Sequence, residues 1–198
     1  MGIPVLILGE SGSGKSTSLR NFEEGQIGIF NVASKPLPFR KKLPKVDGAT
    51  YQVIERSLSN PKLKTYVIDD SQYLLVNEFF DRAKEAGYQK YTDMALNFRN
   101  LVHAVNHNLP DDVIVYFLHH TETDSNGREK AKTIGRMLDE KLVLEGSFDV
   151  VLYCEDQKFY TQANGQSTAK SPEGMFQAVE IPNDLKAVDA AIRDYWGI

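Results

Sequence analysis

Residues 9–16 are the segment of this sequence whose residue types and spacing most clearly specify chemistry. They read Gly-Glu-Ser-Gly-Ser-Gly-Lys-Ser, a glycine and four residues followed by Gly-Lys-Ser. Glycines let the backbone curl until successive N–H groups converge on one phosphate. Lys15 would bring a positive charge to the β- and γ-phosphates, and the Ser16 hydroxyl would bind Mg²⁺. The spacing therefore predicts a nucleotide phosphate site, formed by Gly9, Glu10, Ser11, Gly12, Ser13, Gly14, Lys15, Ser16 and Thr17.

Two adjacent carboxylates follow a second apolar segment, residues 65–68. An apolar strand that ends in an acid is how phosphate-loop proteins present a carboxylate to the Mg²⁺ shell, and we assign this role to Asp69. Asp70 stands where many ATPases of this type place the acid that polarises the attacking water. The alternative is that Asp70 and Ser71 only cap the helix that follows.

Alternating strand-like and helix-like segments would position these residues. Apolar runs predict strands over residues 3–8, 27–32, 50–54, 65–69, 113–118 and 150–154. Apolar residues at helical spacing predict helices after the phosphate loop, around residues 75–83, 94–105 and 137–142, and after a cap at Asn183. Asn164-Gly165 predicts a hairpin between residues 158–163 and 166–169. This order predicts an α/β fold of one domain, residues 1–198, with a mostly parallel sheet covered by helices on both faces.

The composition is that of an ordinary globular protein, with 198 residues, 41% of them hydrophobic and 25% charged. The net charge of −4 argues against tight nonspecific binding of nucleic acid by the whole surface, although a local basic site would fit. No run approaches the ~20 apolar residues that span a bilayer, so we expect no membrane segment. The single Cys154 cannot form an intramolecular disulfide, which fits a reducing compartment.

Four segments together resemble phage-encoded AAA/RecA-like nucleotide-binding proteins, the Sak-type recombination ATPases. They are the phosphate loop, Phe-Asn-Val-Ala-Ser-Lys-Pro-Leu-Pro-Phe at residues 30–39, Ile-Asp-Asp-Ser at 68–71 and Phe-Leu-His-His-Thr at 117–121. The resemblance implies a three-layer RecA-like P-loop NTPase core with a C-terminal hairpin plus helix, and ATP and Mg²⁺ as cofactors. It also implies a cytoplasmic phage protein that forms a homo-oligomer, a filament or ring, and hydrolyses ATP on single-stranded DNA during recombination or strand annealing.

The resemblance assigns further catalytic roles, but one feature of the family is missing. In RecA-like cores the last residue of a central strand senses the γ-phosphate, and His119 and His120 match this position. Alternation along a strand lets only one of them face the nucleotide. RecA also has a catalytic Glu after the strand that follows the first helix, whereas residues 31–35 contain no acid. Either Asp70 takes that role, or Glu55 does from the end of its expected strand, or hydrolysis is slow.

The resemblance also implies contacts with DNA and with a neighbouring subunit. The DNA-binding loop would be residues 121–133, although a solvated hairpin has the same polar composition. Two aromatic side chains beside a lysine at residues 88–91 could stack on bases or pack at a helix end. The DNA-binding candidates are Arg128, Lys130, Lys132, Tyr88, Lys90 and Tyr91. The basic residues that would complete the site of a neighbouring subunit are Lys130, Lys132 and Arg136.

Two other classes of protein share a phosphate loop of this kind. A small-molecule or nucleotide kinase would need an arginine-rich lid, and residues 121–133 carry only one Arg and two Lys. A non-hydrolysing, nucleotide-dependent assembly module would not need the missing Glu. The sequence lacks the Asn-Lys-x-Asp run of guanine-specific proteins, so adenine is the expected base.

Overall fold

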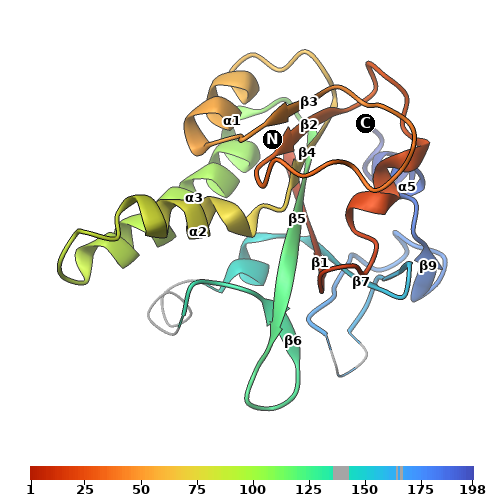
Figure 1. The fold of residues 1–198 in the computed structure, drawn as a ribbon. Coiled ribbons are helices and arrows are strands. Elements are labelled where there is room, and N and C mark those ends of the chain that lie inside the picture. The colour runs from red at the N-terminus through yellow and green to blue at the C-terminus, as the bar shows by residue number, and fades with distance from the viewer. Residues whose placement is uncertain (136–142, 164, 166) are drawn as a thin grey trace.

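The computed structural model describes residues 1–135, 143–163, 165 and 167–198 (Figure 1). The strands are β1 Ile3–Gly9, β2 Gly28–Asn31, β3 Lys45–Asp47, β4 Thr65–Asp69, β5 Ile114–Thr123, β6 Glu129–Ala131, β7 Val150–Glu155, β8 Lys158–Tyr160 and β9 Glu180–Pro182. The α-helices are α1 Tyr51–Leu58, α2 Gln72–Asp81, α3 Gln89–Asn108 and α5 Leu185–Trp196. Two short 3₁₀ helices are η1 Ser16–Asn21 and η2 Leu144–Ser147.

The central strands form a parallel sheet that brings the ends of distant segments together. The strand order is β3-β2-β4-β5-β1-β7-β8-β9. The first six strands of this order are parallel to one another, and the last two, β8 and β9, are antiparallel to their neighbours. Strand β5 lies between β1 and β4, and its register sets His120 opposite Gly9. The carboxyl ends of parallel strands share one edge of a sheet, so the phosphate loop, Asp69 and His120 lie at the same edge. The predicted mixed α/β fold with a mostly parallel sheet is confirmed.

Helices cover both faces of this sheet because the strand residues alternate between two apolar clusters. On one face, α1, α2 and α3 pack over Leu6, Leu8 and Phe117 (Figure 1). On the other face, η1 and α5 pack over the cluster that contains Val5 and Leu118. Burying a side chain of this size stabilises the fold by about 1.5–3 kcal/mol, so the central strands hold the sheet edge rigidly. Among the described residues, no helix has the length and apolar character needed to cross a membrane.

The strand predicted over residues 50–54 is wrong, because this segment begins helix α1. The Thr50 hydroxyl accepts a hydrogen bond from the backbone N–H of Val53 and so caps the helix. Ile54 and Leu58, four residues apart, are its buried residues, which is the spacing of one helical face. The short strand β3, which the sequence did not predict, precedes this helix.

The predicted hairpin over residues 158–169 is also wrong. Strand β8 pairs with β7 through a tight turn at Asp156 and Gln157, both with positive φ, and on its other side with β9. Lys170, which follows the predicted hairpin, forms an antiparallel bridge to Val151 of β7. Residues 164 and 166 of the predicted hairpin lie outside the described residues, as does the helix predicted at 137–142.

Two predicted boundaries at the ends of elements also differ. The side chain of Asp184, and not that of Asn183, caps α5 by accepting hydrogen bonds from two backbone N–H groups of the first turn. Strand β5 continues past the predicted end at Leu118 to Thr123 and forms a hairpin with β6. The turn of this hairpin contains Asn126 and Gly127, and Gly127 has φ 77°. The polar segment 121–133 is therefore largely a β-hairpin that extends the central strand beyond the sheet edge.

Candidate functional site

The phosphate loop leaves the buried end of β1 and enters η1 in a conformation that needs glycine. Gly14 has φ 112°, a backbone conformation that residues with a side chain rarely adopt. A Cβ atom at Gly14 would lie 2.7 Å from Oε1 of Gln157. At Gly9 a Cβ atom would collide with the backbone carbonyl oxygen of Cys154. Gly14 is thus required by its backbone conformation, and Gly9 by the close backbone of β7.

Lys15 lies buried inside the loop and is held by the loop itself. Its Nζ donates hydrogen bonds to the carbonyl oxygens of Gly9, at 2.6 Å, and Glu10, at 2.7 Å. Burial lowers the pKa of Lys15 to about 8. An anion beside this ammonium group would favour its charged form, because opposite charges offset the desolvation cost. The loop thus holds the Lys15 ammonium group at its centre, the position that the sequence predicted for it.

Ser16 and Asp69 form a pair of oxygen donors next to the loop. The Ser16 hydroxyl donates a hydrogen bond of 2.8 Å to Oδ1 of Asp69, which is buried at the end of β4. Burial raises the pKa of Asp69 to about 6, even though the bond from Ser16 acts in the opposite direction. Mg²⁺ in nucleotide sites is bound through a small number of protein oxygens together with phosphates and water. A hydroxyl and a carboxylate at this separation fit that ion.

Asp70 is the centre of a charged cluster on the same sheet edge. Its Oδ2 accepts a 2.8 Å bond from Nζ of Lys35, and its Oδ1 lies 2.9 Å from Nε2 of His120. Burial favours a higher pKa, but the bonds from His120 and Lys35 outweigh it and lower the pKa of Asp70 to about 2. The backbone of Asp70 has φ +58°, a strained conformation for a non-glycine residue.

Helix capping does not account for either residue at this position. The side chain of Ser71 makes no capping hydrogen bond to α2, and the carboxylate of Asp70 binds Lys35 and His120. The alternative, in which the side chains of Asp70 and Ser71 only cap α2, is therefore wrong. The strained backbone instead turns the Asp70 carboxylate toward the site.

The two adjacent histidines of β5, which lie where the strand leaves the parallel sheet, point to opposite faces, as the strand alternation requires. His120 lies beside Asp70 at the edge of the pocket. His119 is fully buried, with Nδ1 2.9 Å from the Ser71 hydroxyl and Nε2 2.8 Å from the carbonyl oxygen of Lys132. Burial lowers the pKa of His119 to about 4, so the ring is neutral at pH 7. Between the two candidates, His120 faces the site and His119 fastens the base of the β5–β6 hairpin to the segment behind Asp70.

One cavity of about 290 Å³ collects these groups. Its lining combines the phosphate loop with the carboxyl ends of β2, β4 and β5 and consists of Ser11, Gly12, Gly14, Lys15, Ser16, Thr17, Lys35, Pro36, Pro38, Asp69, Asp70 and His120. Lys35 is the charged member that the sequence interpretation missed. Its position after a strand next to β4 was the available signal, because the ends of neighbouring parallel strands meet at one edge.

The C-terminal part of the chain holds the loop from behind. Nδ2 of Asn183 donates a 3.1 Å bond to the carbonyl oxygen of Gly14 and lies 3.3 Å from Sγ of Cys154. Nη1 of Arg20 donates a 3.0 Å bond to Oδ1 of the same asparagine. The backbone N–H of Gln157 donates to the carbonyl oxygen of Ser13 at 3.1 Å. Asn183 was predicted as a helix cap, but it is a buried brace of the phosphate loop.

Glu55, a candidate for the missing acid, is not brought to this cavity. It lies exposed on α1 and lines a separate groove between α1 and α3, with Leu58, Asn100 and Ala104 among its neighbours. Its expected position at the end of a strand depended on the strand that proved to be a helix. Among the catalytic candidates, the structure therefore gathers Lys15, Asp70 and His120 in one place and leaves Glu55 outside.

The basic candidates on the hairpin lie beyond the cavity. Arg128 is exposed at the turn, and Lys130 forms a 3.1 Å ion pair with Glu122 on the opposite strand. Lys132 is exposed and its backbone carbonyl accepts the bond from His119. Arg136 lies outside the described residues.

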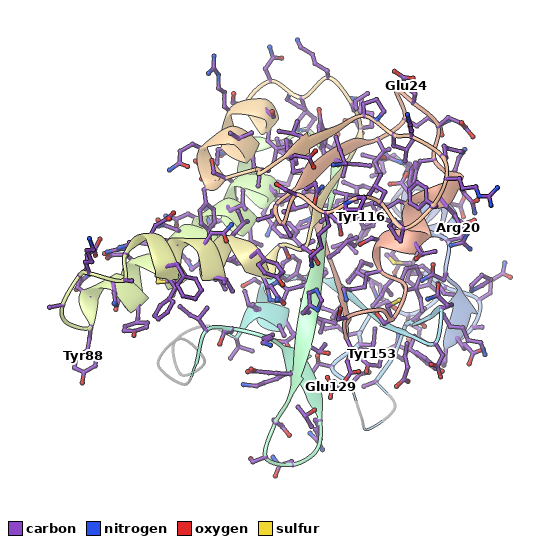
Figure 2. The ribbon with its side chains drawn as sticks, viewed as in Figure 1. Arg20, Glu24, Tyr88, Tyr116, Glu129 and Tyr153 are labelled. Carbon is purple, nitrogen blue, oxygen red and sulfur yellow. The ribbon has the colours of Figure 1, made fainter. Side chains whose placement is uncertain are left out.

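The aromatic and basic cluster at residues 88–91 is a helix end rather than a stacking surface. Nζ of Lys90 lies 5.5 Å from the ring centroid of Phe79 and 5.4 Å from that of Tyr91, and this lysine is buried. Tyr91 packs against the core cluster, and only Tyr88 is widely exposed. Figure 2 shows Tyr88 at the outer tip of the α2–α3 pair, away from Glu129 and Tyr153. Of this segment, only the Tyr88 ring is available for a partner.

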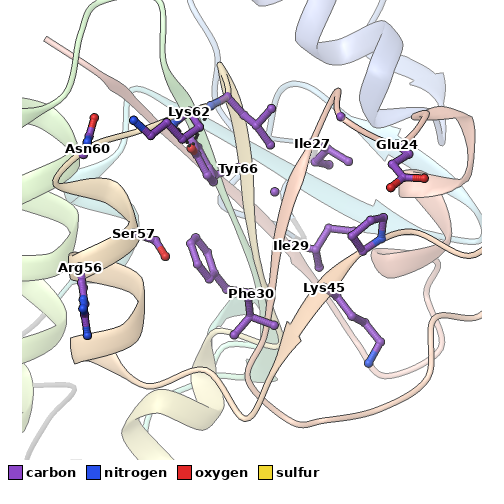
Figure 3. A pocket seen from close by; sticks show the side chains of 15 residues that line it. Glu24, Ile27, Ile29, Phe30, Lys45, Arg56, Ser57, Asn60, Lys62 and Tyr66 are labelled. Atoms are coloured by element: carbon purple, nitrogen blue, oxygen red, sulfur yellow. Dashed lines mark hydrogen bonds between the residues drawn. The ribbon is translucent and has the colours of Figure 1, made fainter.

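A larger pocket, of about 600 Å³, lies at the amino ends of β2 and β4 (Figure 3). The rings of Phe30 and Tyr66 stack beside it at 5.9 Å, and charged side chains such as Glu24, Arg56 and Lys62 stand at its rim. Its described lining includes no residue that the sequence predicted for the site. The larger pocket and the predicted site residues thus lie at opposite ends of the sheet strands, with the predicted residues at the carboxyl end.

Comparison with known proteins adds no assignment to this geometry. No protein-family model matches the chain, and a search of the curated proteins gives no match.

Proposed function

We propose that this chain binds ATP together with Mg²⁺ in the 290 Å³ cavity and hydrolyses the nucleotide in a RecA-like P-loop core. The observation that carries the proposal is the meeting of three parts in one cavity. They are the phosphate loop with Lys15, the Ser16–Asp69 oxygen pair, and the Asp70 carboxylate with His120. A flexible glycine turn would need neither the buried lysine nor the two carboxylates.

Each part of the cavity has a defined task in this proposal. The N–H groups of the loop bind phosphate oxygens, and Lys15 exchanges its bonds to the loop carbonyls for bonds to the β- and γ-phosphates. Ser16 and Asp69 would hold Mg²⁺, whose charge would offset that of the phosphates. Because the pKa of Asp70 is about 2, this group stays ionised and accepts a hydrogen bond from a water molecule, which it thereby orients. His120 fixes the carboxylate in place.

The RecA-like assignment and the DNA partner depend on β5 and its hairpin. His120 stands where β5 leaves the parallel sheet, between the loop strand and the Asp69 strand, which supports its role as the phosphate sensor. His119 links Ser71, directly after Asp70, to the hairpin at Lys132. A change at the nucleotide would thus reach the hairpin through one side chain. We include single-stranded DNA as the partner of this hairpin.

The charges of the hairpin set the expected strength of DNA binding. Residues 121–133 carry three basic side chains and three acidic ones, so one hairpin has no excess positive charge. Affinity for the phosphate backbone rises with the number of basic contacts and falls steeply with salt. Binding should therefore be weak for one subunit, sensitive to salt and dependent on the assembly of several subunits.

The test is ATP binding and hydrolysis by the wild-type protein, by Lys15→Ala and by a control, Lys84→Ala, whose exposed lysine lies beyond α2. We expect Lys15→Ala to lose at least about tenfold in ATP affinity, since bonds to charged groups contribute about 1.5–3 kcal/mol. The control should match the wild type. Failure of the wild-type protein to bind ATP with Mg²⁺ would refute the proposal.

The same assay separates the alternatives. Hydrolysis should rise when single-stranded DNA is added at low salt, and no response would refute the DNA part of the proposal. Transfer of phosphate to a nucleoside or nucleotide would identify a kinase instead. Binding without turnover under every condition would identify an assembly module.

A further inference from the structure

We infer that Lys35 supplies, within the same chain, the positive charge that contacts the terminal phosphate of a bound nucleoside triphosphate. This inference rests on the proposed function, because it needs a nucleotide in the cavity. It differs from the expectation of the resemblance, in which Lys130, Lys132 or Arg136 of a neighbouring subunit completes the site. The cavity already contains two lysines of its own chain, Lys15 from the loop and Lys35 from the segment that follows β2.

The backbone around Lys35 is held so that the side chain enters the cavity. Nδ2 of Asn31, a buried residue, donates a 2.6 Å bond to the carbonyl oxygen of Lys35. Ser34, directly before it, has φ +55°, a conformation that is uncommon for a residue with a side chain. Nζ of Lys35 lies 4.8 Å from the ring centroid of Tyr73 on α2. Contacts from β2 and α2 thus hold Lys35 at the cavity. A lysine on a free surface would need no such contacts.

The present partner of Lys35 is one that it can leave. Its Nζ pairs with Asp70 at 2.8 Å, but the lysine side chain is 53% exposed while that of Asp70 is 11% exposed. A partly exposed ammonium group on a flexible stem changes partners at low cost, and such ion pairs contribute little to stability. Asp70 would keep its bond to His120 after the lysine moved. A terminal phosphate carries more negative charge than a carboxylate and would compete for Lys35.

This exchange would make the site respond to the third phosphate. With a diphosphate bound, Lys35 stays on Asp70, and the carboxylate is occupied by both of its partners. With a triphosphate bound, Lys35 moves to the terminal phosphate and leaves one oxygen of Asp70 free to orient water. Lys35 would therefore both stabilise the triphosphate and release the group that acts on water.

The binding test compares Lys35→Gln with the wild type, using the non-hydrolysable ATP analogue AMPPNP and ADP, each with Mg²⁺, by calorimetry. We expect the affinity for AMPPNP to fall about tenfold and that for ADP by less than about twofold, because only one ligand has the terminal phosphate. Lys35→Arg, which keeps the charge, should retain most of the preference for AMPPNP. The control is Lys41→Gln, since Lys41 lies in the same loop but pairs with Glu23.

Two results of this binding test would contradict the inference. They are an equal loss for both nucleotides and no loss for either. If the wild-type protein bound neither nucleotide, the proposed function itself would fail, which is a different result from the loss of discrimination.

Mixing two impaired variants decides whether Lys35 acts within its own chain. Lys15→Ala keeps Lys35 but has a defective loop, while Lys35→Gln keeps the loop but lacks the second lysine. If Lys35 acts in its own chain, the mixture hydrolyses ATP no faster than the sum of its parts. Recovery of hydrolysis in the mixture would show that the lysine crosses between subunits and would overturn the inference.

Discussion

Acidification should destabilise this protein through His119, the histidine that joins Ser71, next to Asp70, to the β5–β6 hairpin. The ring is fully buried, and burial lowers its pKa from 6.5 to about 4. In the unfolded chain the ring is hydrated and binds a proton as the pH falls through 6.5. The folded protein keeps a neutral ring until about pH 4 because burial disfavours the charged form, even though the bond to the carbonyl oxygen of Lys132 acts in the opposite direction.

The size of the effect follows from the two pKa values. Each pKa unit corresponds to about 1.4 kcal/mol of free energy, so the full effect of His119 is about 3 kcal/mol. Because the unfolded state binds the proton first, stability is unaffected above pH 6.5 and is lost progressively between pH 6.5 and 4. A loss of this size is a large share of the 5–15 kcal/mol that is typical of folded domains.

Urea unfolding of the wild-type protein and of His119→Gln at pH 7 and pH 4.5 measures this loss. The wild type should lose about 2.5 kcal/mol more than the variant over this range, and the difference removes the contributions of all other groups. His103→Gln is the matched control, since His103 is exposed on α3, and it should follow the wild type. Equal pH dependence in the wild type and His119→Gln would refute the argument, as would an NMR titration of the His119 ring with a midpoint near pH 6.5.

Two further predictions concern the C-terminal part of the chain. Asn183→Ala should weaken AMPPNP binding several-fold, because one hydrogen bond to the Gly14 carbonyl contributes about 0.5–1.5 kcal/mol. The far-ultraviolet circular dichroism should stay unchanged, because Asp184 still caps α5. An unchanged affinity would contradict the bracing role. Asp189→Asn should cost about 3 kcal/mol in urea unfolding, since the buried carboxylate pairs with Arg193 at 2.7 Å and accepts bonds from two buried hydroxyl groups. A cost below about 0.5 kcal/mol, typical of a surface change, would show that this network adds little to stability.

The parts of the fold that the sequence predicted are those with a strong local pattern. Three segments, β1, β4 and β5, have unambiguous apolar runs, and α3 has a clear periodic apolar face. These patterns were enough to predict a mostly parallel sheet covered by helices. The α1 segment was misread because Thr50, Val53 and Ile54 are β-branched and suit a strand, whereas the spacing of Ile54 and Leu58 suits a helix. Burial against the sheet decides between these patterns, and a short segment does not contain that information.

The site was predictable where it follows one strand and not where it depends on distant contacts. The phosphate loop and Asp69 each follow an apolar run, so their chemistry could be read directly. Lys35 enters the cavity through contacts with Asn31, Asp70 and Tyr73, and only the strand order brings these residues together. The choice between His119 and His120 likewise required knowledge of which sheet face carries the cavity. Local patterns identify groups, whereas tertiary contacts decide which groups meet.

The position of β1 in the sheet has a consequence for how the protein is made. Although it is the first strand of the chain, β1 pairs with β5 and β7, whose residues follow more than a hundred positions later. Its loop is then fastened by Asn183, 169 residues after Gly14. During synthesis on the ribosome, the amino-terminal segment must therefore wait, unpaired and apolar, until most of the chain has emerged. Contacts of such long range also slow folding. The emerging chain would acquire a finished phosphate loop only as one of the last events of its folding, so a nascent chain that stalls early should be unable to retain nucleotide.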